Sequence, residues 1–208
     1  IQDAIFDLID AGKLCFASGT SLTPSPEGLE RFYRGIERYR EKIILRPLEV
    51  SNSAEVVSRL GIMAMNTAVE ADIYGNVNSS HVGGGAVVNG IGGAGDFSRN
   101  ALLAVFMTPS TARGGKISRI VPQVTHVDHT EHEVHAIVTE QGLADLRGLD
   151  PRERAVSIIE NCAHPRYRDA LLDYHRRAAR KGGHEPILLD EAFKWHLNFE
   201  KTGDMIPE

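Results

Sequence analysis

The sequence has few of the residues on which several classes of protein depend. Only two of its 208 residues are cysteine, Cys15 and Cys162, and both lie in apolar surroundings, which is typical of a reducing compartment rather than of a disulfide-stabilised scaffold. Acidic residues outnumber basic ones, 28 to 23, and no basic stripe is present that could neutralise nucleic-acid phosphates. No apolar run approaches the length of a membrane-spanning helix. Nucleic acid and membrane are therefore not expected as partners.

The chain does have enough apolar sequence, 42%, to bury a substantial core. Short strand-like runs alternate with helical patterns, which favours an α/β fold with a layered sheet flanked by helices. Two helices have typical starts, Ser25 before Pro26 and Asp150 before Pro151. Residues 43–46 are expected to form a buried strand. Residues 117–127 and 133–139 are expected to pair as a hairpin through the polar turn 128–132.

The expected domain covers residues 1–181, and residues 182–208 form a tail that packs on the surface. Gly182 and Gly183 break the last long helical pattern, and the sequence after them is less regular. The chain begins at Ile1, without a methionine and inside an amphipathic helical pattern. We therefore expect it to be part of a longer protein.

A run of glycines is the first candidate for a functional site. Seven glycines lie within the thirteen positions 83–95, here called the glycine loop. Glycine lets backbone amides approach an oxygen-rich or anionic group. The order of the glycines matches neither the dinucleotide nor the P-loop fingerprint. We interpret the loop as an amide-lined oxyanion or phosphate site, with Asn89 and Asp96 beside it; the alternative is a tight strand-to-helix connection without a ligand.

The second candidate is Glu140, which follows the apolar residues 136–138 and precedes Gly142. Open α/β sheets bind their ligands at the carboxyl ends of the strands, where a carboxylate can position or polarise a substrate. A helix cap or a salt-bridged turn residue is the alternative.

Histidines and carboxylates also gather in residues 126–135. In the expected hairpin, His126 and His129 would point to opposite faces of the ribbon, so we expect a hydrogen-bonded polar turn and no metal. Serine, histidine and acid triads could be drawn from Ser79, Ser80 or Ser110. With nine histidines such combinations arise by chance, and no GxSxG motif supports one.

Several long motifs follow one another along the chain: residues 61–79, NGIGGAGDFSRN from Asn89, TPSTARGGKISRIVP from Thr108, HVDHTEHEV from His126 and VTEQGLADLRG from Val138. Taken together and in this order, they are similar to the C-terminal domain of the acetyl-CoA hydrolase/transferase family, and most of all to its succinyl-CoA:acetate CoA-transferase type. The resemblance covers nearly the whole chain to about Tyr174.

The resemblance implies a class I acyl-CoA:carboxylate CoA-transferase with the fold shared by CoA-transferases and ribose-5-phosphate isomerases. In that family a glutamate attacks the acyl-CoA thioester, giving an acyl-glutamyl anhydride and then a glutamyl-CoA thioester, with a small carboxylic acid as acceptor. No tightly bound cofactor is implied, because CoA enters as a substrate. The implied partners are the protein's own N-terminal domain and a second copy in a homodimer. The implied location is cytoplasmic, or mitochondrial in a eukaryote.

The resemblance also implies roles for individual residues. Gly93, with its neighbour Gly92, matches an oxyanion and CoA contact of the family, and Arg113 matches a basic residue that meets CoA. Asn52 and Glu140 match the active-site asparagine and a second, non-nucleophilic glutamate. The nucleophilic glutamate belongs to a Glu-x-x-Gln-Asp motif whose end Ile1-Gln2-Asp3 resembles. We therefore expect that glutamate just before Ile1, and an inactive isolated chain.

Three alternatives remain open at this point. An acetyl-CoA hydrolase would share every motif and differ only in using water as the acceptor. The isolated chain could be a CoA-binding domain without catalysis. A metal-dependent hydrolase is the third alternative, and only residues 126–135, here called the histidine run, favour it.

Overall fold

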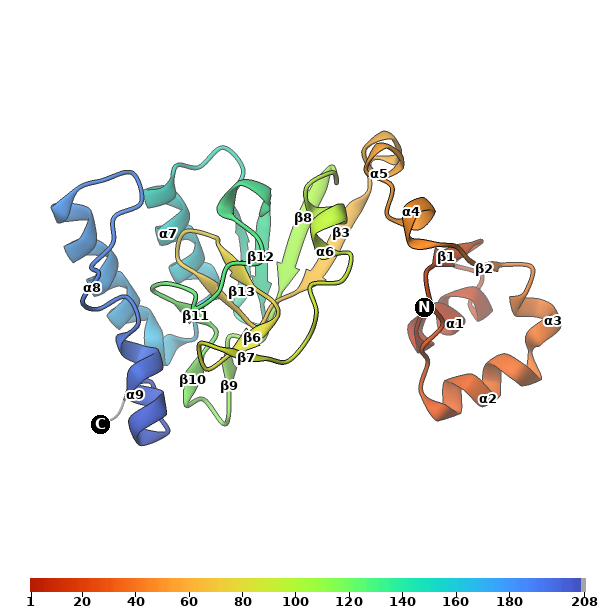
Figure 1. Ribbon diagram of the computed structural model, residues 1–208, viewed down its shortest axis with the longest axis horizontal. Helices are drawn as coiled ribbons and strands as arrows, with labels where there is room; N and C mark the ends of the chain where they lie inside the picture. The colour runs from red at the N-terminus through yellow and green to blue at the C-terminus, as the bar shows by residue number, and fades with distance from the viewer. Residues whose placement is uncertain (207–208) are drawn as a thin grey trace. The chain divides into compact units, whose positions relative to one another are not determined.

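The computed structural model describes residues 1–206 and divides into two compact units, Ile1–Val56 and a second that begins at Val57 (Figure 1). Helix α5, Ala54–Leu60, crosses this boundary. The predicted division into residues 1–181 and a tail stays a prediction, and residues 207 and 208 of that tail lie outside the described residues.

The first unit is mainly helical. Its small core consists of Phe6, Ile9 and Tyr39, all nearly inaccessible to solvent. Its elements are α1 (Asp3–Asp10), β1 (Ala17–Gly19), α2 (Pro26–Arg34), α3 (Ile36–Tyr39), β2 (Ile43–Leu45) and α4 (Leu48–Ser51). Helix α2 begins as predicted, because the Ser25 hydroxyl accepts a hydrogen bond from the Gly28 amide at 3.0 Å.

Two expectations for the first unit are wrong. Strand β2 is not buried, because it pairs only with β1 in a two-stranded parallel sheet, and Ile44 and Leu45 are 42% and 55% exposed. The apolar surroundings expected for Cys15 do not enclose it, because Cys15 is exposed.

The second unit contains two sheets, which bears out the predicted α/β class. The larger has the strand order β13-β12-β8-β3, in which β3 (Met63–Thr67), β8 (Leu103–Met107) and β12 (Ala136–Thr139) are parallel and β13 (Gly142–Asp145) is antiparallel to β12. The smaller has the order β11-β4-β5. Its strands are β4 (Glu70–Asp72), β5 (Val77–Asn78) and β11 (Ile120–Val121).

Two short antiparallel ribbons complete the strands, β6 (His81–Val82) with β7 (Ala86–Val87), and β9 (Thr111–Ala112) with β10 (Ile117–Ser118). Helix α6 (Ala94–Ser98) follows β7, and a 3₁₀ helix (Glu131–Glu133) precedes β12. The hairpin expected from residues 117–127 and 133–139 is wrong. Strand β11 pairs in parallel with β4, whereas β12 pairs with β8 and β13.

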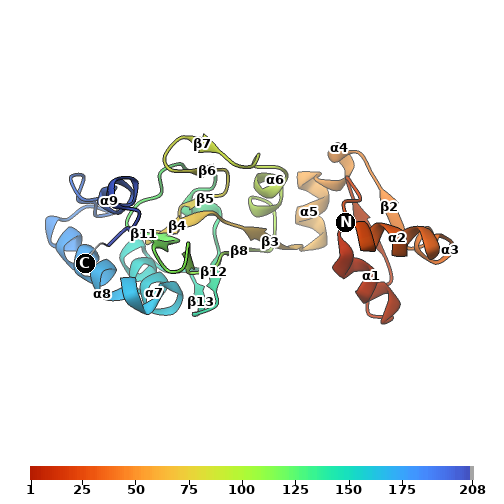
Figure 2. The same ribbon diagram turned by 90° about the horizontal axis from the view of Figure 1, so that it is seen from below.

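Helix α7 (Pro151–Cys162) packs on β12 and β13, and α8 (Pro165–Lys181) packs on α7 (Figure 2). Asp150 caps α7 as predicted, accepting hydrogen bonds from the amides of Arg152 and Glu153. The main core joins both sheets to these helices and includes Ile73, Phe106, Ile137, Ile158, Ile159 and Leu171. Among residues 1–206, no helix is both long and apolar enough to cross a bilayer.

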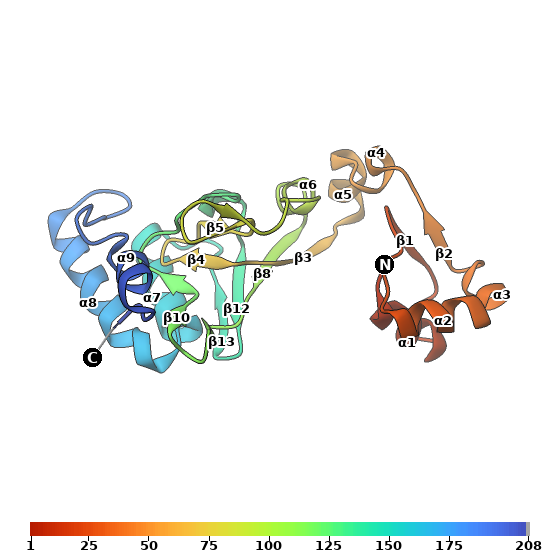
Figure 3. The same ribbon diagram turned by 60° about the horizontal axis from the view of Figure 1, so that its bottom comes forward.

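Helix α9 (Lys194–Thr202) is attached to the second unit near α8 and the β9–β10 ribbon (Figure 3). Its Trp195 ring lies 5.3 Å from that of Tyr167, between centroids, and its His196 Nε2 lies 2.8 Å from the Glu70 carboxylate. The residues after Lys181 therefore contribute to the core of this unit.

Glycine is required at position 142, the start of β13, because α7 packs closely against the backbone there and not because of an unusual turn. Its φ is not positive, but a Cβ there would lie 2.8 Å from the carbonyl oxygen of Asn161 in α7. We expect Gly142→Ala to lower the free energy of unfolding by about 1–3 kcal/mol, the usual cost of overpacking. Urea denaturation of the chain measures this. Gly85→Ala is the control, because its Cβ meets nothing within 4 Å. Equal midpoints for the two variants would contradict the prediction.

Candidate active site

Glu140 lies in the two-residue turn between β12 and β13, at the carboxyl end of β12. Because β8 and β12 are parallel neighbours, the segment after β8 reaches the same edge of the sheet. There the Ser110 amide donates a hydrogen bond to Glu140 Oε2 at 2.7 Å, and the Ser110 hydroxyl donates to Oε1. Gln141 Nε2 donates to Oε1 at 3.0 Å. The carboxylate is thus held in one orientation.

These contacts also fix the charge of Glu140. Burial alone would raise the pKa of its carboxyl, but the hydrogen bonds from Ser110 and Gln141 outweigh burial and lower the pKa to about 2. The group is ionised at every ordinary pH and cannot act as a general acid. A strand follows Glu140, so it is not a helix cap. The sequence pointed to Ser110 only as a member of a chance triad, because its contact with Glu140 depends on the pairing of β8 with β12.

The glycine loop, residues 83–95, contains the turn between β6 and β7, strand β7 itself and the connection from β7 into α6. Gly83, Gly84 and Gly92 have positive φ values of 56°, 78° and 57°, which require glycine. Gly93 has φ −85° and is the residue before the first turn of α6. In the part of the chain that the structure describes, the Gly93 amide donates a hydrogen bond to no protein atom. The loop therefore connects a strand to a helix, and the backbone of residues 83–92 is exposed to solvent.

Arg113 lies at the exposed tip of the β9–β10 ribbon, with a positive φ of 50°. Its guanidinium carbon is 5.9 Å from the centroid of the Phe199 ring in α9. Asn52 follows α4 in the first unit, and its Oδ1 accepts a hydrogen bond from the Ser51 hydroxyl at 3.1 Å.

The structure therefore places the predicted site residues on separate segments. Gly92 and Gly93 are neighbours in the glycine loop. No hydrogen bond or ion pair within residues 1–206 joins them to Glu140 or to Arg113.

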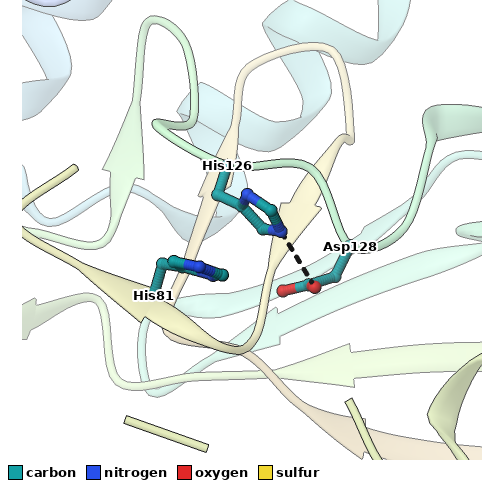
Figure 4. Close-up of side chains that lie close together, drawn as sticks. All are labelled: His81, His126 and Asp128. Carbon is teal, nitrogen blue, oxygen red and sulfur yellow. Dashed lines mark ion pairs between the residues drawn. The ribbon is translucent and has the colours of Figure 1, made fainter. Parts of the chain in front are cut away.

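Part of the histidine run forms a cluster with His81. Donor atoms of His81, His126 and Asp128 lie within 4.8 Å of one another. Figure 4 shows the His126 ring pointing at Asp128, with His126 Nε2 3.3 Å from the carboxylate and the His81 ring beside it. The His81 and His126 rings overlap, with centroids 3.8 Å apart and planes 32° apart.

This cluster is better suited to hydrogen bonding than to holding a metal. Imidazole lone pairs lie in the ring planes, so two overlapping rings cannot both point at one ion unless a ring turns. Asp128 Oδ2 already accepts from the Ser79 amide at 2.8 Å and the Ser80 hydroxyl at 2.6 Å. His129 does diverge from His126, but not because of a hairpin: its ring is fully buried, 4.7 Å from that of Phe106 between centroids. The absence of a metal stays a prediction.

Comparison with known proteins gives consistent results. The model of the acetyl-CoA hydrolase/transferase C-terminal domain matches residues 28–175. Succinyl-CoA:acetate CoA-transferase of Clostridium kluyveri is 57% identical over 206 residues, which are 99% of this chain and 38% of that protein. Propanoyl-CoA:succinate CoA transferase of Escherichia coli is 50% identical over 206 residues, 99% of this chain and 42% of that protein. Acetyl-CoA hydrolase of Schizosaccharomyces pombe is 50% identical over 214 residues, with 99% and 41% covered.

The chain thus spans about two fifths of the length of the curated relatives it matches. Solved structures show the same fold. RipA from Yersinia pestis superimposes with a TM-score of 0.74 at 28% identity, over 85% of this chain and 42% of that one. A 4-hydroxybutyrate CoA-transferase from Porphyromonas gingivalis gives 0.67 at 25% identity, over 85% and 43%.

Proposed function

Because this chain belongs to the acetyl-CoA hydrolase/transferase family as its C-terminal domain, we propose that it forms part of the active site of an acyl-CoA:carboxylate CoA-transferase of the succinyl-CoA/acetate type. The observation that carries the proposal is the 57% identity along 99% of the chain to a protein named for that reaction. The proposed substrates are an acyl-CoA and a small carboxylic acid. The remaining part of the enzyme, its N-terminal domain, and a second copy in a homodimer are the proposed partners.

In the proposed reaction a glutamate carboxylate outside this chain attacks the thioester carbonyl. The thiolate of CoA leaves, an acyl-glutamyl anhydride forms, and CoA then attacks the glutamyl carbonyl and releases the acid. Each tetrahedral state places negative charge on the former carbonyl oxygen. We assign Gly93 as a donor to that oxygen, because the residue is only half-buried and its amide donates to no protein atom within residues 1–206.

Glu140 has a supporting role in this proposal. An ionised carboxylate has about four lone-pair sites, and Ser110 and Gln141 occupy three of them. The remaining site can orient a donor on the substrate, and the low pKa keeps it an acceptor. The exposed guanidinium of Arg113 would meet the anionic part of CoA, and Asn52 is proposed as the active-site asparagine of the family.

Glu140→Ala in the complete enzyme is expected to slow turnover about 10- to 100-fold through lost orientation, while the covalent CoA adduct still forms. Glu140→Gln keeps one acceptor oxygen for Ser110 and nearly the same side-chain shape, so it shows the effect of removing the charge alone. The lowered pKa means that the stability supplied by this carboxylate is present above its usual value of 4.5 and is lost only as pH falls towards about 2. Because the carboxylate stays ionised from pH 5 to pH 8, the ratio of wild-type to Glu140→Gln kcat/KM should be constant over that range. A ratio that falls towards one below pH 6 would refute the assignment.

The hydrolase alternative is favoured by the relatives named acetyl-CoA hydrolase. A transferase passes CoA to a carboxylate, whereas a hydrolase releases free CoA to water. The test is to incubate the complete enzyme with succinyl-CoA and increasing acetate. We expect acetyl-CoA to form with saturable dependence on acetate and little free thiol to appear without it. Rapid release of free CoA in the absence of any acid would favour the hydrolase.

A further inference from the structure

One short segment, residues 128–133, contacts the chain beside the glycine loop at two points, the base of the β6–β7 ribbon and the end of α6, and α6 also packs on β3 and β8. Between these points the loop is exposed, and a Cβ at Gly83, Gly84, Gly85, Gly90 or Gly92 would meet nothing within 4 Å. Its order must therefore come from its ends, because seven glycines give the free chain a large conformational entropy.

The first point of attachment is the base of the β6–β7 ribbon. The Val88 amide donates to the Ser80 carbonyl at 2.8 Å, and Asn89 Nδ2 donates to the Ser79 carbonyl at 2.9 Å. Asp128, which lies outside the ribbon in sequence, fixes this base by two hydrogen bonds. Its Oδ2 accepts one from the Ser79 amide at 2.8 Å and one from the Ser80 hydroxyl at 2.6 Å.

Asp128 is itself fixed and ionised. Its amide donates to the Val77 carbonyl at 2.9 Å, which ties it to β5. Burial would raise the pKa of its carboxyl, but the hydrogen bonds from Ser80 and from the Ser79 amide hold the pKa below its usual value. Asn78 also helps to fix the base of the ribbon, because its Oδ1 accepts hydrogen bonds from the amides of Ser80 and His81.

The second point of attachment is the end of α6. Arg99 Nε donates to Glu133 Oε2 at 2.6 Å, and the Ser98 hydroxyl lies 3.5 Å from the same oxygen. The other oxygen of Glu133 accepts from the Thr130 amide at 3.2 Å, which closes a capping box on the 3₁₀ helix. Glu133 is only 7% exposed, whereas the Arg99 side chain that it holds is 63% exposed.

We infer that residues 128–133 form a clamp that holds the glycine loop at both ends, with Asp128 and Glu133 as positioning residues. An oxyanion donor is effective only if it is already in place when charge develops, so a loop that carries one must be fixed in advance. The catalytic consequence of the clamp rests on the proposed function; the clamp itself does not. The carboxylates of the histidine run then serve the loop rather than a metal ion.

Hydrogen exchange on this chain tests the clamp without any assay of activity. We expect Asp128→Ala to accelerate exchange of the Ser79 and Val88 amides about tenfold or more. We expect Glu133→Ala to do the same for the Phe97 amide of α6 and for the Ala101 amide just after it, which donates to the Phe97 carbonyl. Asp128→Asn and Glu133→Gln, which each keep one acceptor oxygen, should restore much of the protection. They also keep the test decisive if an alanine variant fails to fold. Asp145→Ala is the control, because that carboxylate, at the end of β13, pairs with Arg147 and not with the loop.

Kinetics of the complete enzyme then separate the clamp from the proposed function. If both hold, Asp128→Ala lowers kcat about tenfold or more with a smaller change in KM, and Asp128→Asn recovers part of it. Unchanged exchange at all four amides would overturn the clamp whatever the kinetics show. Faster amide exchange in Asp128→Ala with unchanged kcat would support the clamp but exclude the glycine loop from the proposed mechanism.

Discussion

The purified 208-residue chain is expected to fold and yet to transfer CoA from succinyl-CoA to acetate no faster than the uncatalysed background. It spans about two fifths of the length of its curated relatives, and the proposed nucleophile is a glutamate outside it. Gly93 and Glu140 can stabilise and orient a reacting group, but they supply no attacking carboxylate. Positioning and water exclusion also need the opposite wall of the site.

This expectation has two readouts. Circular dichroism and urea denaturation establish that the chain is folded, and a coupled assay for acetyl-CoA measures transfer. Calorimetry with CoA then decides whether the chain binds CoA by itself without catalysis. Transfer at a rate near that of a complete relative would show that these 208 residues contain the whole active site. The proposed position of the nucleophile would then be wrong.

Gly93→Val in the complete enzyme is expected to lower kcat/KM by about 10² or more, the usual scale for losing one oxyanion donor. A branched side chain at this position would shield the backbone amide from the thioester carbonyl. The backbone at Gly93 lies outside the left-handed region, since φ is −85° rather than positive as at Gly92, so a side chain there carries no penalty from φ. The effect should therefore fall on the reaction and not on stability.

Ala94→Val is the matched control for Gly93→Val. It adds branching one residue further along, in the first turn of α6, and leaves the Gly93 amide without a side chain of its own. We expect the control to stay within a few fold of wild type. A folded Gly93→Val enzyme with unchanged kcat/KM would exclude the glycine loop from the mechanism.

The parts of the fold that the sequence predicted depend on local chemistry. Ser25 and Asp150 cap helices through atoms within three residues of themselves, so their patterns could be interpreted without knowing the rest of the fold. Strand pairing is different, because a strand does not specify its partner. Residues 136–139 do form a strand, but it pairs with β8 and β13 rather than with residues 117–127. The prediction that β2 is buried was wrong for a related reason: β2 pairs with β1 in a two-stranded sheet, and although Ile43 packs against the small core of the first unit, Ile44 and Leu45 stay exposed.

The candidate site divides in the same way. Glu140 could be placed at a strand end from the residues around it, but Ser110, which fixes its charge, is brought to it only by the pairing of β8 with β12. His81 likewise meets His126 and Asp128 from a separate ribbon. Period-two geometry therefore gave the wrong reason for the divergence of His126 and His129, whose positions depend on packing against Phe106 and His81.

The position of the covalent CoA adduct tests the account most directly. The complete enzyme would be mixed with succinyl-CoA in the absence of acceptor acid, quenched in acid, digested and mapped by mass spectrometry. The account predicts CoA in thioester linkage to a glutamate outside this chain, with Glu140 unmodified in both the wild-type enzyme and the Gly93→Val variant. CoA attached to Glu140 would contradict the account, because that glutamate would then be the nucleophile.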